Sequence, residues 1–121
     1  MIIGIETLKA LLTENFEPGT EESPAILTLG HSCPDTDAWV SSLAAALLYR
    51  AAGKRAWVLK PDALPMPRET AFLLGEALSE AAEKLPAPDS PRVMSALTCH
   101  RAVLHLTDHA DRGALNPFVT G

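Results

Sequence analysis

Cysteine, positive charge and long apolar runs are all scarce in this sequence. Only two cysteines, Cys33 and Cys99, occur among 121 residues, and their spacing matches no zinc site or disulfide framework. The longest apolar stretch, residues 43–48, is far too short to cross a bilayer. A secretory signal has a basic start followed by a long apolar run, and we see no such pattern in this sequence. We therefore expect a cytoplasmic protein with no membrane role.

The shortage of positive charge bears on the partner. Ten Lys and Arg residues stand against fifteen Asp and Glu residues, so the formal net charge is -5. The basic residues are scattered, whereas a nucleic-acid backbone requires clustered Lys and Arg. An acidic protein that binds a phosphate usually recruits a metal cation, which inverts the local field. The charge balance disfavours nucleic acid and is compatible with a small phosphate-containing molecule.

The composition is that of one folded domain. Hydrophobic residues make up 47% of the chain and charged residues 21%, which is far from the profile of a disordered protein. Strands that alternate with helices predict an α/β fold, here a three-layer sandwich with a mostly parallel sheet. Apolar spacing and composition predict helices over residues 5–12, 36–52 and 68–85, and strands over residues 25–29, 55–60 and 102–107.

Side chains that can bind a metal ion follow the first predicted strand. The run Gly-His-Ser-Cys-Pro-Asp-Thr-Asp, residues 30–37, opens the next helix and supplies His31, Asp35 and Asp37 within seven residues. These residues also fit a plain helix cap, because Asp and Thr side chains accept hydrogen bonds from the free amides and complement the helix dipole. From the residues alone, capping and metal binding are equally open.

A further acidic group follows the last predicted strand. Asp108 and His109 come directly after residues 102–107, and ligands of α/β sheets sit beyond the carboxyl ends of the strands. We therefore expect Asp108 to converge with the first motif. One imidazole and three carboxylates suit Mn²⁺ or Mg²⁺. Two such ions can activate a bridging water, so hydrolysis of a phosphate ester or anhydride is the natural reaction.

Both segments resemble motifs of the manganese-dependent (family II) inorganic pyrophosphatases, which belong to the DHH-type phosphoesterase superfamily. That family has Gly-His-x-Asn-Pro-Asp-Thr-Asp as its first motif, and residues 30–37 match it except that Cys33 replaces the Asn. Its second motif is a strand ending in Val-Asp-His-Asn, to which residues 103–109 are similar. The resemblance covers residues 25–111, after a helix and loop at residues 1–24, and the first motif carries most of its specificity.

The resemblance implies a two-metal site in an incomplete DHH-type N-terminal domain. It assigns His31 and Asp35 to one metal and Asp37 to the second, with Asp108 bridging both and Mn²⁺ or Mg²⁺ as the cofactor. His109 would orient a carboxylate or a phosphate. In the family the ions position a water against phosphorus without a covalent protein intermediate. No catalytic residue beyond the metal ligands is therefore implied.

Other features of the family are missing from this sequence. Thr107 replaces a Val, and Ala110 replaces the Asn that follows Asp-His. The sequence lacks the Asp-His-His motif that names the superfamily, a further metal-ligand Asp, and the C-terminal domain that grips substrate with basic residues. The resemblance thus implies a truncated or incomplete enzyme, and full activity is not expected from this chain alone.

Three functions are compatible with these observations. The first is a metal-dependent phosphohydrolase that acts on pyrophosphate, polyphosphate or a small phosphodiester. The second is a non-catalytic module that keeps the fold and binds a metal, phosphate or nucleotide. The third is a structural remnant whose Asp residues only cap a helix; we rank it last, because the His and the three Asp residues occur together. An incomplete domain leaves a sheet edge and helix faces uncovered, so we also expect a homo-oligomer.

The remaining conspicuous residues have plainer interpretations. His105 lies inside a predicted strand, where a lone His is usually a hydrogen-bonded packing residue. Trp39 and Trp57 are expected to pack between helix and sheet. Cys33 lies near a helix start that favours a thiolate, but the neighbouring carboxylates oppose one, so we expect it to pack passively.

Overall fold

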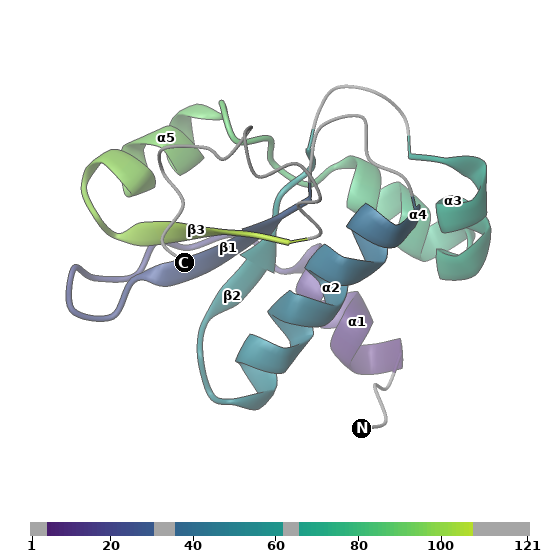
Figure 1. The fold of residues 1–121 in the computed structure, drawn as a ribbon, viewed down its shortest axis with the longest axis horizontal. Helices are drawn as coiled ribbons and strands as arrows, with labels where there is room; N and C mark the ends of the chain where they lie inside the picture. The colour runs from purple at the N-terminus through teal and green to yellow at the C-terminus, as the bar shows by residue number, and fades with distance from the viewer. Residues whose placement is uncertain (1–4, 31–35, 62–65, 108–121) are drawn as a thin grey trace.

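The computed structural model describes residues 5–30, 36–61 and 66–107, which form a parallel sheet with helices on both faces (Figure 1). Within these residues the sheet has three strands, β1 (Ala25–Leu29), β2 (Ala56–Val58) and β3 (Ala102–Leu106). Their order is β2-β1-β3, so the first strand of the chain is the central one. Both strand pairs are parallel. The predicted α/β class with a parallel sheet is confirmed.

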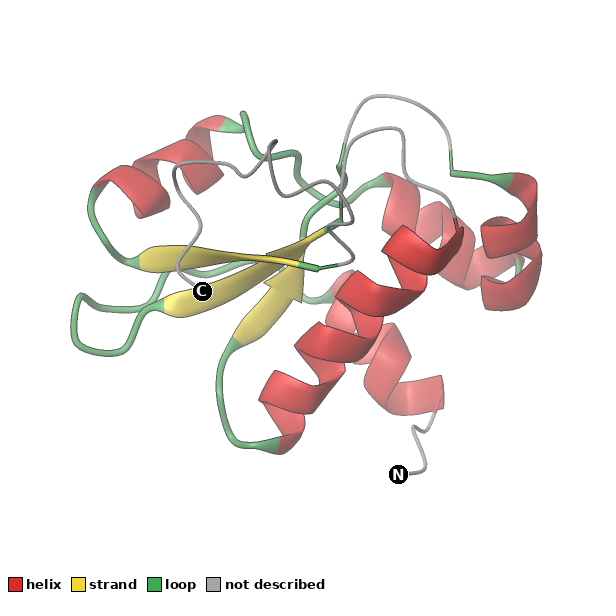
Figure 2. Cartoon of the chain, in the orientation of Figure 1, coloured by secondary structure: helices red, strands yellow, loops and turns green. Residues whose placement is uncertain are grey.

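Five helices accompany the sheet in the described part of the chain (Figure 2). They are α1 (Ile5–Thr13), α2 (Thr36–Ala51), α3 (Arg68–Leu74), α4 (Glu76–Glu83) and α5 (Pro91–Thr98). In Figure 1, α1 and α2 lie on one side of the sheet and α5 lies on the other. Among the described helices, none is long and apolar enough to span a membrane.

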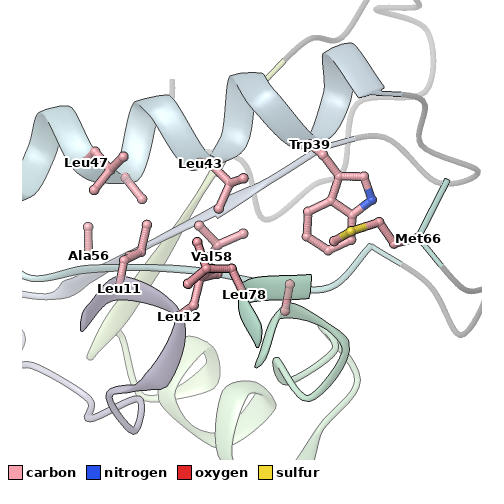
Figure 3. Close-up of a cluster of buried hydrophobic side chains, with 11 residues drawn as sticks. Leu11, Leu12, Trp39, Leu43, Leu47, Ala56, Val58, Met66 and Leu78 are labelled. Carbon is pink, nitrogen blue, oxygen red and sulfur yellow. The ribbon is translucent and has the colours of Figure 1, made fainter. Parts of the chain in front are cut away.

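Alternation along the strands divides the core between the two faces. Side chains of a strand point alternately to opposite faces, and Trp57 therefore packs in the cluster on the α5 side while its neighbours Ala56 and Val58 pack in the cluster on the α2 side. The α2-side cluster also takes in α1 and α4, as Figure 3 shows for Leu11 and Leu78. One apolar cluster therefore lies on each face of the sheet, between the sheet and the helices that cover that face.

The longest helix ends as its sequence predicts. Gly53 has a positive φ of 83°, a conformation that costs side-chain-bearing residues energy. Its amide donates to the Arg50 carbonyl at 3.0 Å, and the Lys54 amide donates to the Tyr49 carbonyl at 3.0 Å. This pair of hydrogen bonds is a Schellman motif, which satisfies carbonyls that the helix itself leaves free.

Two predicted elements differ from the structure. The single helix expected over residues 68–85 is broken at Gly75, whose φ of 86° and ψ of 165° separate α3 from α4. The strand expected over residues 55–60 is shorter, Ala56–Val58. Helix α5 is absent from the sequence-based expectation, although Ser90-Pro91 is a typical helix start and Val93, Ala96 and Leu97 share a helical face.

The central packing position of β3 gives a first test. Leu104 is 1% exposed in the α5-side cluster, so Leu104→Ala leaves a cavity and should lower the free energy of unfolding by about 2–5 kcal/mol. Leu48 on α2 is 52% exposed, so Leu48→Ala is the matched control and should change it by less than about 0.5 kcal/mol. Urea unfolding followed by circular dichroism measures both. Equal effects would contradict the described packing of β3.

Candidate functional site

The carboxyl ends of β1 and β3 lie side by side. Leu29 pairs with Leu106 in the parallel register, and the Thr107 amide donates to the Leu29 carbonyl at 2.9 Å. His31 comes two residues after Leu29, and Asp108 comes two residues after Leu106. The two segments with predicted metal ligands therefore leave the sheet from paired positions, as expected for residues that share a site at this edge.

A close backbone approach fixes the start of α2 against the end of β1. A Cβ on Gly30 would lie 3.0 Å from both the Cβ and the carbonyl oxygen of Ala38. Any larger residue would therefore need strand and helix to move apart. Gly30 thus has a packing role at the first residue of the predicted motif.

A buried hydrogen bond holds α2 to the sheet a little further along, and a second one lies within the helix beside it. The Thr28 hydroxyl donates to the Ser42 carbonyl at 2.8 Å, and the Ser42 hydroxyl donates to the Trp39 carbonyl at 3.1 Å. Both hydroxyl-bearing residues are buried, so these bonds satisfy groups that would otherwise be costly to desolvate. The Trp39 ring lies beside Met66 in the α2-side cluster (Figure 3). The first two turns of α2 are therefore held from two directions.

The start of α2 also meets α3. The Thr70 hydroxyl donates to the Thr36 hydroxyl at 3.0 Å, and the Thr36 hydroxyl donates to the Glu69 carboxylate at 3.4 Å. Thr36 stands between Asp35 and Asp37 in the sequence. The contact joins residues 34 positions apart, and no sequence pattern indicates it. Hydrogen bonds from α3 thus reach the predicted motif at Thr36.

A second polar group lies where β2 ends. Lys60 pairs with Glu83 at 2.9 Å, and the Met66 amide donates to the other oxygen of the Glu83 carboxylate at 2.7 Å. Burial acts to raise the pKa of Glu83, but the hydrogen bonds from Lys60 and Met66 and the charge of Lys60 outweigh it, so the pKa lies below its ordinary value of 4.5. The ammonium group of Lys60 is thereby engaged with Glu83.

Most of the predicted ligands fall outside the described residues. These are His31, Asp35 and Asp108, together with the neighbouring His109. Asp37 lies in the first turn of α2. In the ranges that the structure does describe, no group of three His, Cys, Asp or Glu side chains is arranged to hold a metal ion. The metal site stays a prediction, and the described residues define only its frame.

His105 has the packing role that its position in a strand predicts. Its Nδ1 hydrogen-bonds to the Tyr49 hydroxyl of α2, and the two rings meet edge to face with centroids 5.4 Å apart. Trp57 likewise packs against Phe16 in the α5-side cluster. Cys99 is an exposed free thiol, and Cys33 lies outside the described residues. The contacts of His105 and Trp57 are thus packing contacts, as their positions in the sequence predict.

Comparison of the chain with known protein families, curated proteins and solved structures gives no match in any of the three.

The contact at Gly30 gives a second test. Gly30→Ala places a methyl group against the Ala38 carbonyl and should lower the free energy of unfolding by about 1–3 kcal/mol, the cost of forcing atoms into a filled space. Urea unfolding at neutral pH measures the change. An unchanged free energy would mean that α2 does not approach β1 as closely as described.

The Glu83 ion pair predicts a pH dependence. Because folding lowers the pKa of Glu83, the ionised carboxylate stabilises the fold above the ordinary pKa of 4.5, and this contribution disappears as the pH falls through the folded-state value. Glu83→Gln should therefore destabilise the protein at pH 7 and lose that effect in acid. Unfolding free energies from pH 7 to pH 3 measure it. Glu80 is exposed on the same helix, so Glu80→Gln is the matched control. If the difference in unfolding free energy between the two variants stays the same from pH 7 to pH 3, the prediction is wrong.

Proposed function

We propose that this chain is a metal-dependent phosphohydrolase-like protein of the DHH type, acting on pyrophosphate, polyphosphate or a small phosphodiester. The observation that carries the proposal is the in-register pairing of Leu29 with Leu106. It supports the proposal because Leu29 and Leu106, the last residues of strands that precede His31 and Asp108 in the sequence, lie next to each other at the carboxyl edge of a parallel sheet, where ligands of such sheets bind. The resemblance of residues 30–37 and 103–109 to the pyrophosphatase motifs supplies the chemistry.

The donor set suits the proposed ion. His31, Asp35, Asp37 and Asp108 would hold it, and one imidazole with three carboxylates is a set that Mn²⁺ accepts and Mg²⁺ tolerates. When bound, two such ions would supply a polarised water and neutralise charge on a phosphoryl group. The close packing of Gly30 against Ala38 near the start of α2 supports the proposal, because Asp37 belongs to the first turn of that helix. Rigid elements hold ligands more precisely than loops do.

The fold leaves apolar side chains on its surface, which supports the proposal of a homo-oligomer. Val40 is exposed on α2, and Phe72 and Leu73 are exposed on α3. In the described part of the chain, β3 also forms one edge of the sheet. Its sequence, Ala-Val-Leu-His-Leu, contains no Lys or Pro of the kind that protects edge strands.

Metal binding separates the proposal from simple helix capping. Asn caps a helix about as well as Asp does, but it is a neutral and weaker ligand. Asp35→Asn and Asp37→Asn should therefore leave stability nearly unchanged and weaken Mn²⁺ binding by about tenfold or more. Loss of the free Mn²⁺ signal in electron paramagnetic resonance measures binding. Asp89→Asn, an exposed change before α5, is the matched control and should bind as the unmodified chain does.

Turnover then separates the enzyme from a binding module. Phosphate release from pyrophosphate, tripolyphosphate and a small phosphodiester is measured with Mn²⁺ present, alongside calorimetric binding of phosphate and of a nucleotide. Turnover that disappears in Asp35→Asn supports the enzyme, whereas tight phosphate or nucleotide binding without turnover supports the non-catalytic module. If the unmodified chain binds no Mn²⁺, the metal-dependent enzyme is wrong, and tight phosphate or nucleotide binding would then still support the non-catalytic module.

A further inference from the structure

We propose that a cleft at the amino edge of the sheet binds the phosphoryl group of a small anionic molecule, and that it does so without a metal ion. The cleft lies where α2 ends and β2 begins, beside the loop that follows α1, and has a volume of about 610 Å³. Pockets for small ligands typically have volumes of roughly 300–1,000 Å³. The charged residues that line it are Glu14, Glu17, Arg50, Lys54 and Arg55.

Two arginine side chains of the cleft are held over one aromatic ring. The guanidinium carbon of Arg50 lies 5.3 Å from the centre of the Trp57 ring, and that of Arg55 lies 5.6 Å from it. Cations are attracted to the face of an indole. Arg50 is fixed further, because its Nε donates to the Ala56 carbonyl at 2.7 Å and its Nη1 donates to the Glu14 carboxylate at 2.8 Å. Its side chain is only 18% exposed, so its charge is in place before any ligand arrives.

Hydrogen-bond donors in this cleft are left unfilled. A guanidinium has five N–H donors, and Ala56 and Glu14 use one each of those on Arg50. The other three have no partner among the described residues. Lys54 forms no ion pair within the same part of the chain. Donors from several side chains suit a phosphoryl group, whose oxygens are arranged around a tetrahedral centre, better than they suit a planar carboxylate with two oxygens.

The charge of the cleft differs in sign from that of the whole chain. Three cations face two carboxylates there, in a protein whose formal net charge is -5. The contact between Arg55 and Glu17 is long, at 3.5 Å, and both side chains are well exposed, so it contributes little to stability. A phosphoryl group carries a charge of about −1.5 to −2 at neutral pH. It can therefore replace Glu17 as the partner of Arg55.

A purely structural role for the basic residues is the alternative. Cations near the C-terminus of a helix complement its dipole, and Arg50 stands in the last turn of α2, shortly before Lys54. This role accounts for two of the three cations but not for the cleft that they line. It predicts no saturable binding of an anion, which is the property that separates the two interpretations.

The test is a titration of the full chain with pyrophosphate in metal-free buffer of low ionic strength. Calorimetry measures the affinity, and nuclear magnetic resonance follows the indole N–H signals of the two tryptophans. Trp57 lies beside the arginines, whereas Trp39 lies roughly 16 Å from Arg50 along the axis of α2. Citrate, whose charge at pH 7 is similar, is titrated in the same way. Because no metal is present, the result does not depend on the predicted metal site.

We expect saturable binding of pyrophosphate that shifts the Trp57 signal and leaves the Trp39 signal in place. Citrate should bind about fivefold more weakly, the equivalent of one hydrogen bond. Lys54→Gln and Arg55→Gln should each weaken pyrophosphate binding by about fivefold, the effect of losing one unit charge about 4 Å away in water. Glu17→Gln should instead tighten binding by about twofold, because it removes a charge that repels the ligand.

Two variants outside the cleft are the matched controls. Arg68 is exposed at the start of α3, so Arg68→Gln changes the net charge as Arg55→Gln does. Asp37→Asn alters a predicted metal ligand. Both should bind pyrophosphate within about twofold of the unmodified chain, because distant exposed charges are screened by salt.

Four results would overturn the proposal. They are an absence of saturable binding, an equal loss in Arg68→Gln, a shift of the Trp39 signal in place of the Trp57 signal, and citrate binding as tight as that of pyrophosphate. Loss of affinity in Arg68→Gln would mean that the effect is one of net charge. None of these results decides whether the chain binds Mn²⁺, so the cleft and the metal site stand or fall separately.

Discussion

Pairing of β1 with β3 joins two stretches of chain that are far apart in the sequence. It runs from Ala25 opposite Ala102 to Leu29 opposite Leu106, and the hydrogen bond from Thr107 to Leu29 extends it one residue further. The same pairing builds the middle of the apolar core and determines where the segments after both strands begin. Core and candidate site thus depend on one ladder of backbone hydrogen bonds, and a slip of one residue would reverse the side chains on each face.

Helix α2 is held at its start by contacts of different kinds. Gly30 permits close backbone packing, Thr28 of β1 donates to the Ser42 carbonyl of the helix, and Thr70 bonds to the first residue of the helix, Thr36. A helix held only by apolar contacts can slide or rotate over a smooth surface, whereas directional bonds and steric contacts restrict both motions. Thr36, which stands between two of the proposed ligands in the sequence, lies at this restrained end. Glu83, which ties Lys60 to Met66, gives the neighbouring strand end a similar restraint.

Local signals in the sequence account for most of the elements. The Ala- and Leu-rich run before Gly53 predicts α2, and apolar runs predict β1 and β3. The single helix predicted over residues 68–85 relies partly on Phe72 and Leu73, which prove to be exposed, so apolar spacing alone misses the break at Gly75. Contacts between distant residues, such as Thr36 with Thr70, leave no local signal. For the site, the sequence provides only predicted ligands and the structure shows the adjacent strand ends, while most of the predicted ligands lie outside the described residues.

The position of β1 at the centre of the sheet has a consequence for the way the protein is made. Of the three described strands, β1 emerges first from the ribosome, and it needs β3, near the other end of the described chain, as its second neighbour. Until then one edge of an apolar strand stays unpaired, and contacts of such long sequence separation form slowly. The described sheet is therefore complete only after β3 has been synthesised. Before that point, binding by a chaperone would protect the unpaired edge of β1.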